Sequence, residues 1–150
     1  MIYDRVAADV TQASALRKNK VAQGIPLTEA EEAVMERGCF TINTANRIES
    51  KQTELRQAFN EMGYFNCQIS NRNWNLGDIF FEDDLKRISE NVAILRKAFF
   101  AYQDTPANPR AEYHYREINL MERVLYDLEK MVDVVEEGYR ECGAFNCGEA

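Results

Sequence analysis

The sequence predicts a mainly α-helical protein, either a helical bundle or a coiled-coil-like assembly of about five helices, formed as a single domain over residues 1–150. Two observations predict this class. Apolar residues recur at alternating spacings of three and four over long segments, which is the period of amphipathic helices. One such segment also recurs 40 residues later in the chain. A chain of 150 residues with 45% hydrophobic content is large enough to bury its own core.

The N-terminal part predicts two short helices. The first is expected over residues 4–22, with one apolar face, and Gly24 and Pro26 interrupt the chain after it. Thr28 and Glu31 form a capping box, in which a hydroxyl and a carboxylate satisfy free amides, so a second helix should follow and end at Gly38. The expected face of the first helix consists of Val6, Val10, Ala13 and Leu16.

A third helix is expected from about Asn43 to Gly63, with Asn43 or Thr44 as its cap. Its apolar seam consists of Ala45, Ile48, Gln52, Leu55, Phe59 and Met62. Residues 64–81 are aromatic and partly alternating, and they predict an irregular connector, with a short strand as one alternative.

Two longer helices are expected in the C-terminal half. The fourth should cover about residues 83–102, where acidic residues at positions 82–84 suit the positive end of the helix dipole. Its seam consists of Leu85, Ile88, Val92, Leu95, Phe99 and Tyr102. The last helix should cover residues 112–141, with a stripe broad enough to pack against more than one neighbour. That stripe consists of Ile118, Met121, Leu125, Leu128, Val132, Val135 and Tyr139.

An internal repeat relates residues 39–60 to residues 79–100. All six seam positions of the third helix coincide with those of the fourth, which indicates a duplicated unit of an aromatic residue, a polar cap and an amphipathic helix. Two amphipathic helices share apolar positions in any case, but the shared arginines favour duplication. The identical pairs are Phe40/Phe80, Arg47/Arg87, Ile48/Ile88, Leu55/Leu95, Arg56/Arg96, Ala58/Ala98 and Phe59/Phe99.

Composition and motifs argue against several classes of function. The net charge of −7 and the absence of a basic cluster argue against binding to nucleic acid. No apolar run is long enough to cross a bilayer, and the first residues lack a signal-peptide pattern, so synthesis in the cytoplasm is expected. No phosphate-binding loop or nucleophile–histidine pair is present. We therefore expect neither enzyme activity nor a cofactor, metal or catalytic residue.

The order of the motifs resembles tail-associated or minor structural proteins of phages and prophages of Gram-positive bacteria. The matching segments are residues 4–10, 27–31, 44–49 and 87–92, Trp74, the loop from Pro106 to Pro109, and residues 119–128 and 142–149. Each motif is short, and their common order along nearly the whole chain carries the resemblance. It implies a structural role in a virion, and it provides no catalytic residues to carry over.

The leading expectation is therefore a virion structural protein near the tail, baseplate or fibre attachment, made in the bacterial cytoplasm and carried in the virion. Its expected partners are copies of itself and other virion proteins. The candidate assembly contacts are Arg47, Arg87, Trp74, Ile118, Met121, Leu125, Leu128, Val132 and Val135. For the two arginines, a surface position covering apolar edges is the alternative to an ion pair.

Two other hypotheses belong to different classes. One is a monomeric helical interaction module that regulates a host or phage protein. The other is a metal-dependent enzyme or sensor, which would use Cys67, Cys142, Cys147 and His114. The cysteines lack the paired spacing of zinc sites, and free thiols are the simpler interpretation. For His114, a solvent-exposed or capping role is expected.

Overall fold

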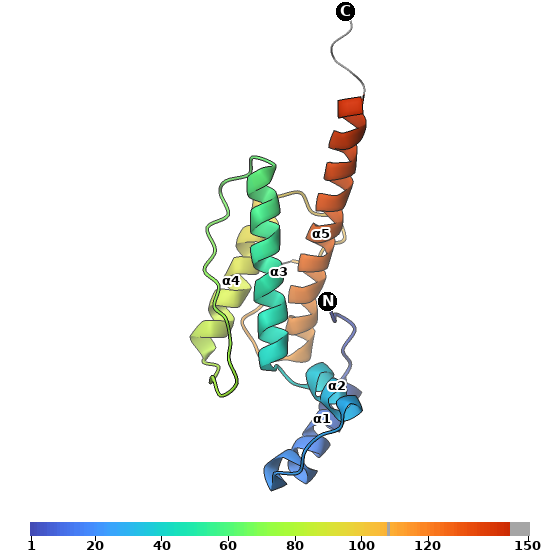
Figure 1. Ribbon diagram of the computed structural model, residues 1–150, viewed down its shortest axis with the longest axis vertical. Coiled ribbons are helices and arrows are strands. Elements are labelled where there is room, and N and C mark those ends of the chain that lie inside the picture. Colours follow the sequence, from blue (N-terminus) through green and yellow to red (C-terminus); the bar gives the residue numbers. More distant parts are fainter. Residues whose placement is uncertain (108, 145–150) are drawn as a thin grey trace, which may run out of the picture.

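The protein is mainly helical, as predicted. A computed structural model describes residues 1–107 and 109–144, with side chains as far as Tyr139. A hairpin of α1 (Ala7–Asn19) and α2 (Glu29–Gly38), with the short 3-10 turn η1 (Val21–Gln23) between them, lies below a bundle of three longer helices (Figure 1). The bundle consists of α3 (Ile42–Glu61), α4 (Glu82–Ala98) and α5 (Tyr115–Ala144).

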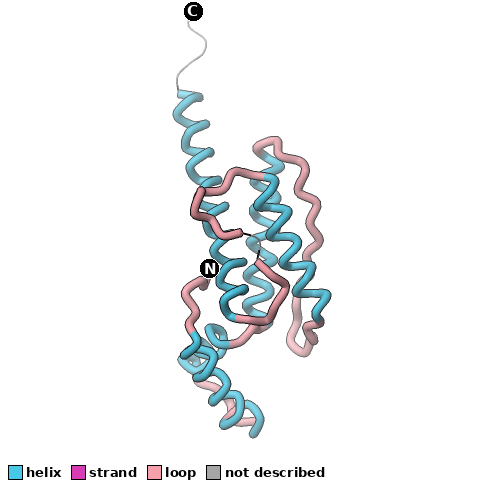
Figure 2. The backbone as a smooth tube through the Cα atoms, turned by 180° about the vertical axis from the view of Figure 1, so that it is seen from behind, coloured by secondary structure: helices cyan, strands magenta, loops and turns pink. Residues whose placement is uncertain are grey.

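The three bundle helices run in the same direction. Phe40 and Phe80 contact each other before the first turns of α3 and α4, with ring centroids 5.1 Å apart, and Phe59 stacks on Phe99 at the other end at 4.5 Å. Between α3 and α5, Lys51 pairs with Glu129 one turn or more above the pair of Arg47 with Glu122. The connectors 62–81 and 99–114 must therefore return along the length of the bundle, as Figures 1 and 2 show.

The core fills the space between these parallel helices. The predicted seams of α3 and α4 are buried in it, apart from the last position of each, and the stripe of α5 faces them both. Tyr113, which precedes α5, also contacts Phe40, at 5.4 Å. An aromatic residue thus precedes the first turn of each bundle helix, and the three rings meet at one end. The largest fully buried apolar side chains are Phe59, Ile48, Leu85, Ile88, Leu95, Met121, Leu125 and Leu128.

The hairpin of α1 and α2 packs closely at Gly38. A Cβ atom at Gly38 would lie 2.2 Å from the backbone oxygen of Asp9 and 2.3 Å from the Cβ of Ala13, so only glycine fits there. Gly38 ends α2 as predicted. The predicted apolar face of α1 is wrong, because Val6 is 53% exposed and only Ala13 is buried. Since α1 packs mainly against α2, Ala13 makes the close contact with Gly38 in place of the valines.

Several predicted helix ends need correction. The capping box of Thr28 and Glu31 is confirmed: the Glu31 amide donates to Thr28 Oγ1 at 3.4 Å, and the Thr28 amide donates to Glu31 Oε2 at 3.0 Å. Helix α3 is capped by Thr41, which accepts from the Thr44 amide, and not by Asn43 or Thr44.

Helix α4 ends at Ala98, short of the predicted position 102. Phe99 has an extended backbone and remains buried, because its ring packs on Phe59 and Tyr64 at the end of the core. Tyr102 lies in the following loop and is exposed, so its assignment to the seam is wrong. Helix α5 covers Tyr115–Ala144, three residues later at both ends than predicted.

The connector 62–81 is irregular, and the alternative of a short strand is wrong among the described residues. Side chains of the helices take the place of a partner strand. Asn46 on α3 accepts from the backbone amide of Trp74 and donates to its carbonyl oxygen, both at 2.9 Å. The amide of Arg72 donates to Glu49 Oε2 at 2.6 Å. Side chains of α3 thus satisfy these backbone groups of the connector.

The close approach at Gly38 provides a test of the hairpin. We expect Gly38→Ala to lower the free energy of unfolding of the hairpin by about 1–3 kcal/mol, because the new methyl group overlaps backbone atoms. Helical Gly138 has nothing within 4 Å of its Cβ position, so Gly138→Ala should raise stability by up to about 1 kcal/mol. Denaturant unfolding and amide exchange measure both. Equal, favourable effects of the two substitutions would contradict the packing described.

Candidate assembly surfaces

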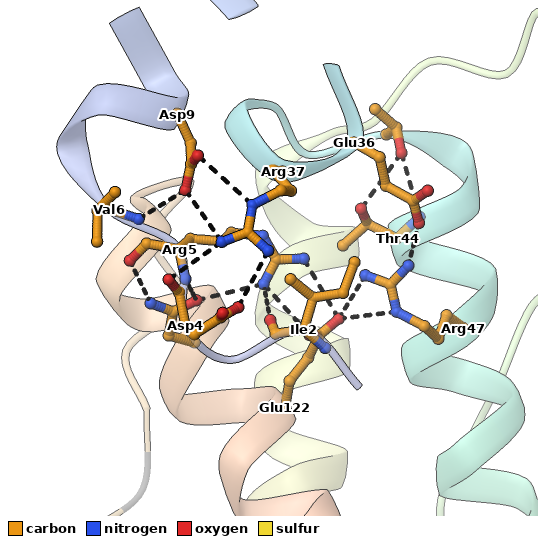
Figure 3. A network of polar contacts seen from close by, with 12 residues as sticks. Ile2, Asp4, Arg5, Val6, Asp9, Glu36, Arg37, Thr44, Arg47 and Glu122 are labelled. Atoms are coloured by element: carbon orange, nitrogen blue, oxygen red, sulfur yellow. Dashed lines mark hydrogen bonds and ion pairs between the residues drawn. The ribbon is translucent and has the colours of Figure 1, made fainter. Parts of the chain in front are cut away.

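A fully buried carboxylate, Glu122 on α5, joins the N-terminal arm (residues 1–6, before α1) to the bundle (Figure 3). Arg5 donates to it at 3.2 and 3.4 Å, and Arg47 on α3 donates at 2.7 and 3.1 Å. The backbone amide of Ile2 donates to the same carboxylate. Arg47 also pairs with Glu36 on α2. One charge therefore connects the arm and α3 with α5, and it reaches α2 through Arg47.

Neighbouring contacts hold the arm in the same place. Asn119 donates to the backbone oxygen of Arg5 at 2.9 Å and accepts from its amide at 3.2 Å. Arg37 on α2 pairs with Asp4 and Asp9. The pKa of Asp9 is lowered, first because its carboxylate accepts from the Val6 amide and then because of Arg37. No periodic pattern in the sequence predicts this network, although the glutamate between the seam positions Met121 and Leu125 is a visible signal.

A second buried network attaches the connector to α3 and α4. Glu49 on α3 is buried and pairs with Arg87 on α4 at 2.5 Å, and Arg87 donates to the backbone oxygen of Ser70 at 2.7 Å. Buried Asn91 donates to Gln52, to the oxygen of Ser70 and to Asn71 at 2.9–3.1 Å. Because the donors belong to one repeat unit and the acceptors to the other unit and to the connector, the network fixes all three together.

The two arginines singled out by the repeat both form ion pairs inside the chain. Arg87 pairs with Glu49, which belongs to the other repeat unit, so here the partner is a repeat partner. The partners of Arg47, Glu122 and Glu36, lie outside the repeat. Both arginine side chains remain partly exposed. These two arginines therefore do not have a purely surface role.

The other predicted contacts lie in the interior. Trp74 is buried against Phe80, and the guanidinium of Arg72 lies 4.3 Å from its ring. Val135 is half-buried at the edge of the core. The same chain already covers the remaining positions, so a partner could reach them only if the bundle opened. Those buried positions are Ile118, Met121, Leu125, Leu128 and Val132. Their role as assembly contacts stays a prediction.

The cysteines and the histidine have no converging geometry in the part described. No group of three His, Cys, Asp or Glu side chains is placed there to hold a metal. Burial raises the pKa of the Cys67 thiol, with Arg56 acting against it. His114 is exposed and its Nδ1 accepts from the Arg116 amide at 3.3 Å, so it caps α5. Cys142 and Cys147 lie outside the side chains that the structure describes.

Exposed apolar residues gather at the end where the bundle helices begin. We call this surface the connector tip, defined by Leu76, Ile79 and Phe81. Leu76 is 99% exposed, beside a turn in which Gly77 has a φ of +99°. Tyr113 lies against the tip and donates to the backbone oxygen of Phe81 at 2.8 Å. Burial raises the pKa of its hydroxyl, and Asp84 and Glu82 add to this.

A second exposed surface lies at the other end, on the α5 tip (residues 133–144), whose last turns extend past α3 (Figure 1). Tyr139 and Val134 are exposed there. At the base of the tip, α3 and α5 enclose a groove of about 150 Å³ with an apolar floor of Leu55, Ala58 and Val132. Its charged lining residues are Lys51, Glu54, Glu129, Asp133 and Glu136.

Lys51 is held within this groove. Its ammonium contacts Glu54 and Glu129 at 2.5 and 2.8 Å. Burial acts to lower the pKa of Lys51, but the two hydrogen bonds outweigh it and the pKa is raised. Lys51, the only lysine among the residues that line the groove, is thus already paired. The carboxylates that line the groove outnumber this one ammonium.

In comparisons with known proteins, no family model, no curated protein and no solved structure matches the chain. Among the described residues, no helix combines the length and apolarity that crossing a bilayer requires. The function has to be inferred from the residues and surfaces described above.

The Glu122 network can be tested by removing its charge. We expect Glu122→Gln to destabilise the protein by about 3–5 kcal/mol, because two arginines lose the carboxylate that offsets their burial. Glu129→Gln, in the partly exposed pair with Lys51, should cost less than about 1 kcal/mol. Denaturant unfolding gives both values. Amide exchange should show increased exposure of residues 1–5 only in the first variant, and similar losses in both variants would refute a special role of Glu122.

The connector network predicts a second asymmetry. Asn91→Leu should cost about 2–4 kcal/mol, because the oxygens of Ser70 and Gln52 lose a buried donor. Asn73→Leu, on the exposed part of the same connector, should change stability by less than about 0.5 kcal/mol. Limited proteolysis should cut residues 68–78 faster in the first variant alone. An uncut connector in Asn91→Leu would show that other contacts suffice.

Proposed function

We propose that this chain is a bacteriophage or prophage virion structural protein, an adaptor at the tail, baseplate or fibre attachment that acts through protein–protein assembly. One structural observation carries the proposal. The bundle buries its own core, yet it leaves apolar side chains exposed at its two ends, at the connector tip and at the α5 tip. The resemblance of the ordered motifs to phage structural proteins supports the particular setting.

Exposed apolar side chains that gather in one place are a common mark of a protein–protein contact. A fully exposed leucine at the head of a glycine turn adds nothing to the core, and with Ile79 and Phe81 beside it this surface is suited to burial by a partner. Contact surfaces at opposite ends of one body are what a connecting protein needs. Copies of the chain, repeated by the symmetry of a particle, would then join neighbouring components.

The body between the two surfaces is suited to a mechanical role. The buried Glu122 and Glu49 networks attach the arm, the hairpin and the connector to the three helices. A partner bound at one end would therefore be held in a fixed position relative to the other end. Under this proposal the chain needs no cofactor and performs no catalysis.

Particle purification tests the proposal. In particles purified from the strain that encodes this chain, we expect a tagged copy to co-sediment with tail components. Leu76→Asp should reduce its incorporation at least about tenfold, since it places a charge in a contact that should be apolar. Gln68→Asp, on an exposed part of the same connector, is the matched control and should incorporate normally.

A chain that is absent from particles and remains a stable monomer in solution would overturn the proposal. Capture of a single host protein by such a monomer would favour the alternative, a helical interaction module.

A further inference from the structure

We infer that the groove between α3 and α5, together with Tyr139 on the α5 tip, binds an amphipathic helix of another protein that carries basic residues beside its apolar stripe. The inference rests on the proposed function only in naming the partner as a virion component. Three observations support it: the continuity of the apolar stripe, the charge of the residues that line the groove and the parallel direction of the helices.

The stripe of α5 continues beyond the helices that cover it. Leu128 and Val132 are buried against α3 and α4, whereas the next positions at the same alternation, Val135 and Tyr139, are half-buried and 64% exposed. Helix α3 ends at Glu61 and α4 at Ala98, so neither continues alongside the last turns of α5 (Figure 1). A seven-residue step places Tyr139 on the same face as Val132, which forms part of the groove floor.

The groove therefore continues the established helix interface outward. Its floor consists of apolar atoms of Leu55, Ala58 and Val132, and its volume of about 150 Å³ accommodates one or two inserted side chains. From Val132 to Tyr139 the stripe extends about 10 Å along the axis, or two turns. An apolar strip of that length with a groove at its base is the geometry of helix-in-groove recognition.

The charged residues that line the groove favour a partner of opposite charge. The groove is lined by Glu54, Glu129, Asp133 and Glu136. Asp133 pairs with Lys130 at 3.0 Å, whereas Glu54 and Glu129 share the single ammonium of Lys51, so carboxylates remain in excess. Basic residues beside the apolar stripe of the partner would complement this charge. A second copy presenting the same surface would instead oppose carboxylate to carboxylate, and this disfavours it as the occupant.

The direction of the helices adds to this charge. The C-terminal ends of α3, α4 and α5 lie at the same end of the bundle, but Arg96 and Lys97 balance the last turn of α4, and α5 ends two turns beyond the groove. The last turn of α3, which lies nearest the groove, has no basic residue to balance it. The C-terminal end of α3 and the carboxylates therefore act together in favouring a cationic partner.

Binding of designed peptides to the full chain tests the inference. The probe is a fluorescein-labelled, two-heptad helical peptide with leucines at the a and d positions and lysines at e and g. One comparison peptide replaces the lysines by glutamates, and another replaces the leucines by serines. Fluorescence anisotropy should show saturable binding of the leucine–lysine peptide, at least about tenfold tighter than of either comparison peptide, and weaker binding at high salt.

Variants then locate the site. Tyr139→Ser and Glu54→Lys should each weaken binding at least about fivefold. Val21→Ser, at an exposed position of η1, and Glu90→Lys, an equal charge change at an exposed position of α4, are the matched controls and should bind like the parent. All four side chains are exposed, so these substitutions leave the core intact.

Several outcomes would overturn the inference: equal binding of all three peptides, loss of binding in the controls as well, or no binding at all. Self-association of the chain that Tyr139→Ser abolishes would identify a second copy as the occupant, and this too would overturn it. A wild-type chain found in particles but unable to bind the peptide would refute this inference and leave the proposed function standing.

Discussion

The parallel direction of α3, α4 and α5 is the constraint on which the remaining structure depends. Antiparallel neighbours can be joined by short turns, but parallel neighbours require the chain to return along the whole bundle, about 30 Å for a helix the length of α3. Residues 62–81 and 99–114 perform this return. The same direction brings Phe40, Phe80 and Tyr113 together at one end, and it gathers three helix C-termini at the other.

The returning connectors explain why this small core contains so many buried polar side chains. A connector that lies against helices has no strand partner for its amides, and an unpaired buried amide costs about 1–3 kcal/mol. Asn46, Glu49 and Asn91 provide the missing partners for residues 70–74. In the other connector, Ser89 donates to the oxygen of Pro109, and Arg96 donates to that of Pro106. The polar residues beside the helical seams thus bind the backbone of the connectors.

The sequence predicts what is periodic and misses what joins distant segments. The seams of α3, α4 and α5 are visible because each residue is read against its neighbours three and four positions away. The contact of Arg5 with Glu122 spans more than a hundred residues, and no local pattern pairs them. The apolar face predicted for α1 is wrong because α2 approaches α1 closely at Gly38, and the small side chain of Ala13 fits there. Parallel packing was also not predicted, since a seam indicates a face and not the direction of its neighbour.

The exposed surfaces are small, and this limits what each can do alone. Burying a side chain such as Leu76, Ile79 or Phe81 contributes about 1.5–3 kcal/mol. Three of them reach the lower part of the 4–15 kcal/mol that association costs in lost freedom of motion. A single contact at either end is therefore weak, and a lasting joint needs a partner with further contacts or several copies bound at once. Because the core is closed without a partner, folding of the chain does not require assembly, and under the proposed function repetition in a symmetric particle would supply the strength that one surface lacks.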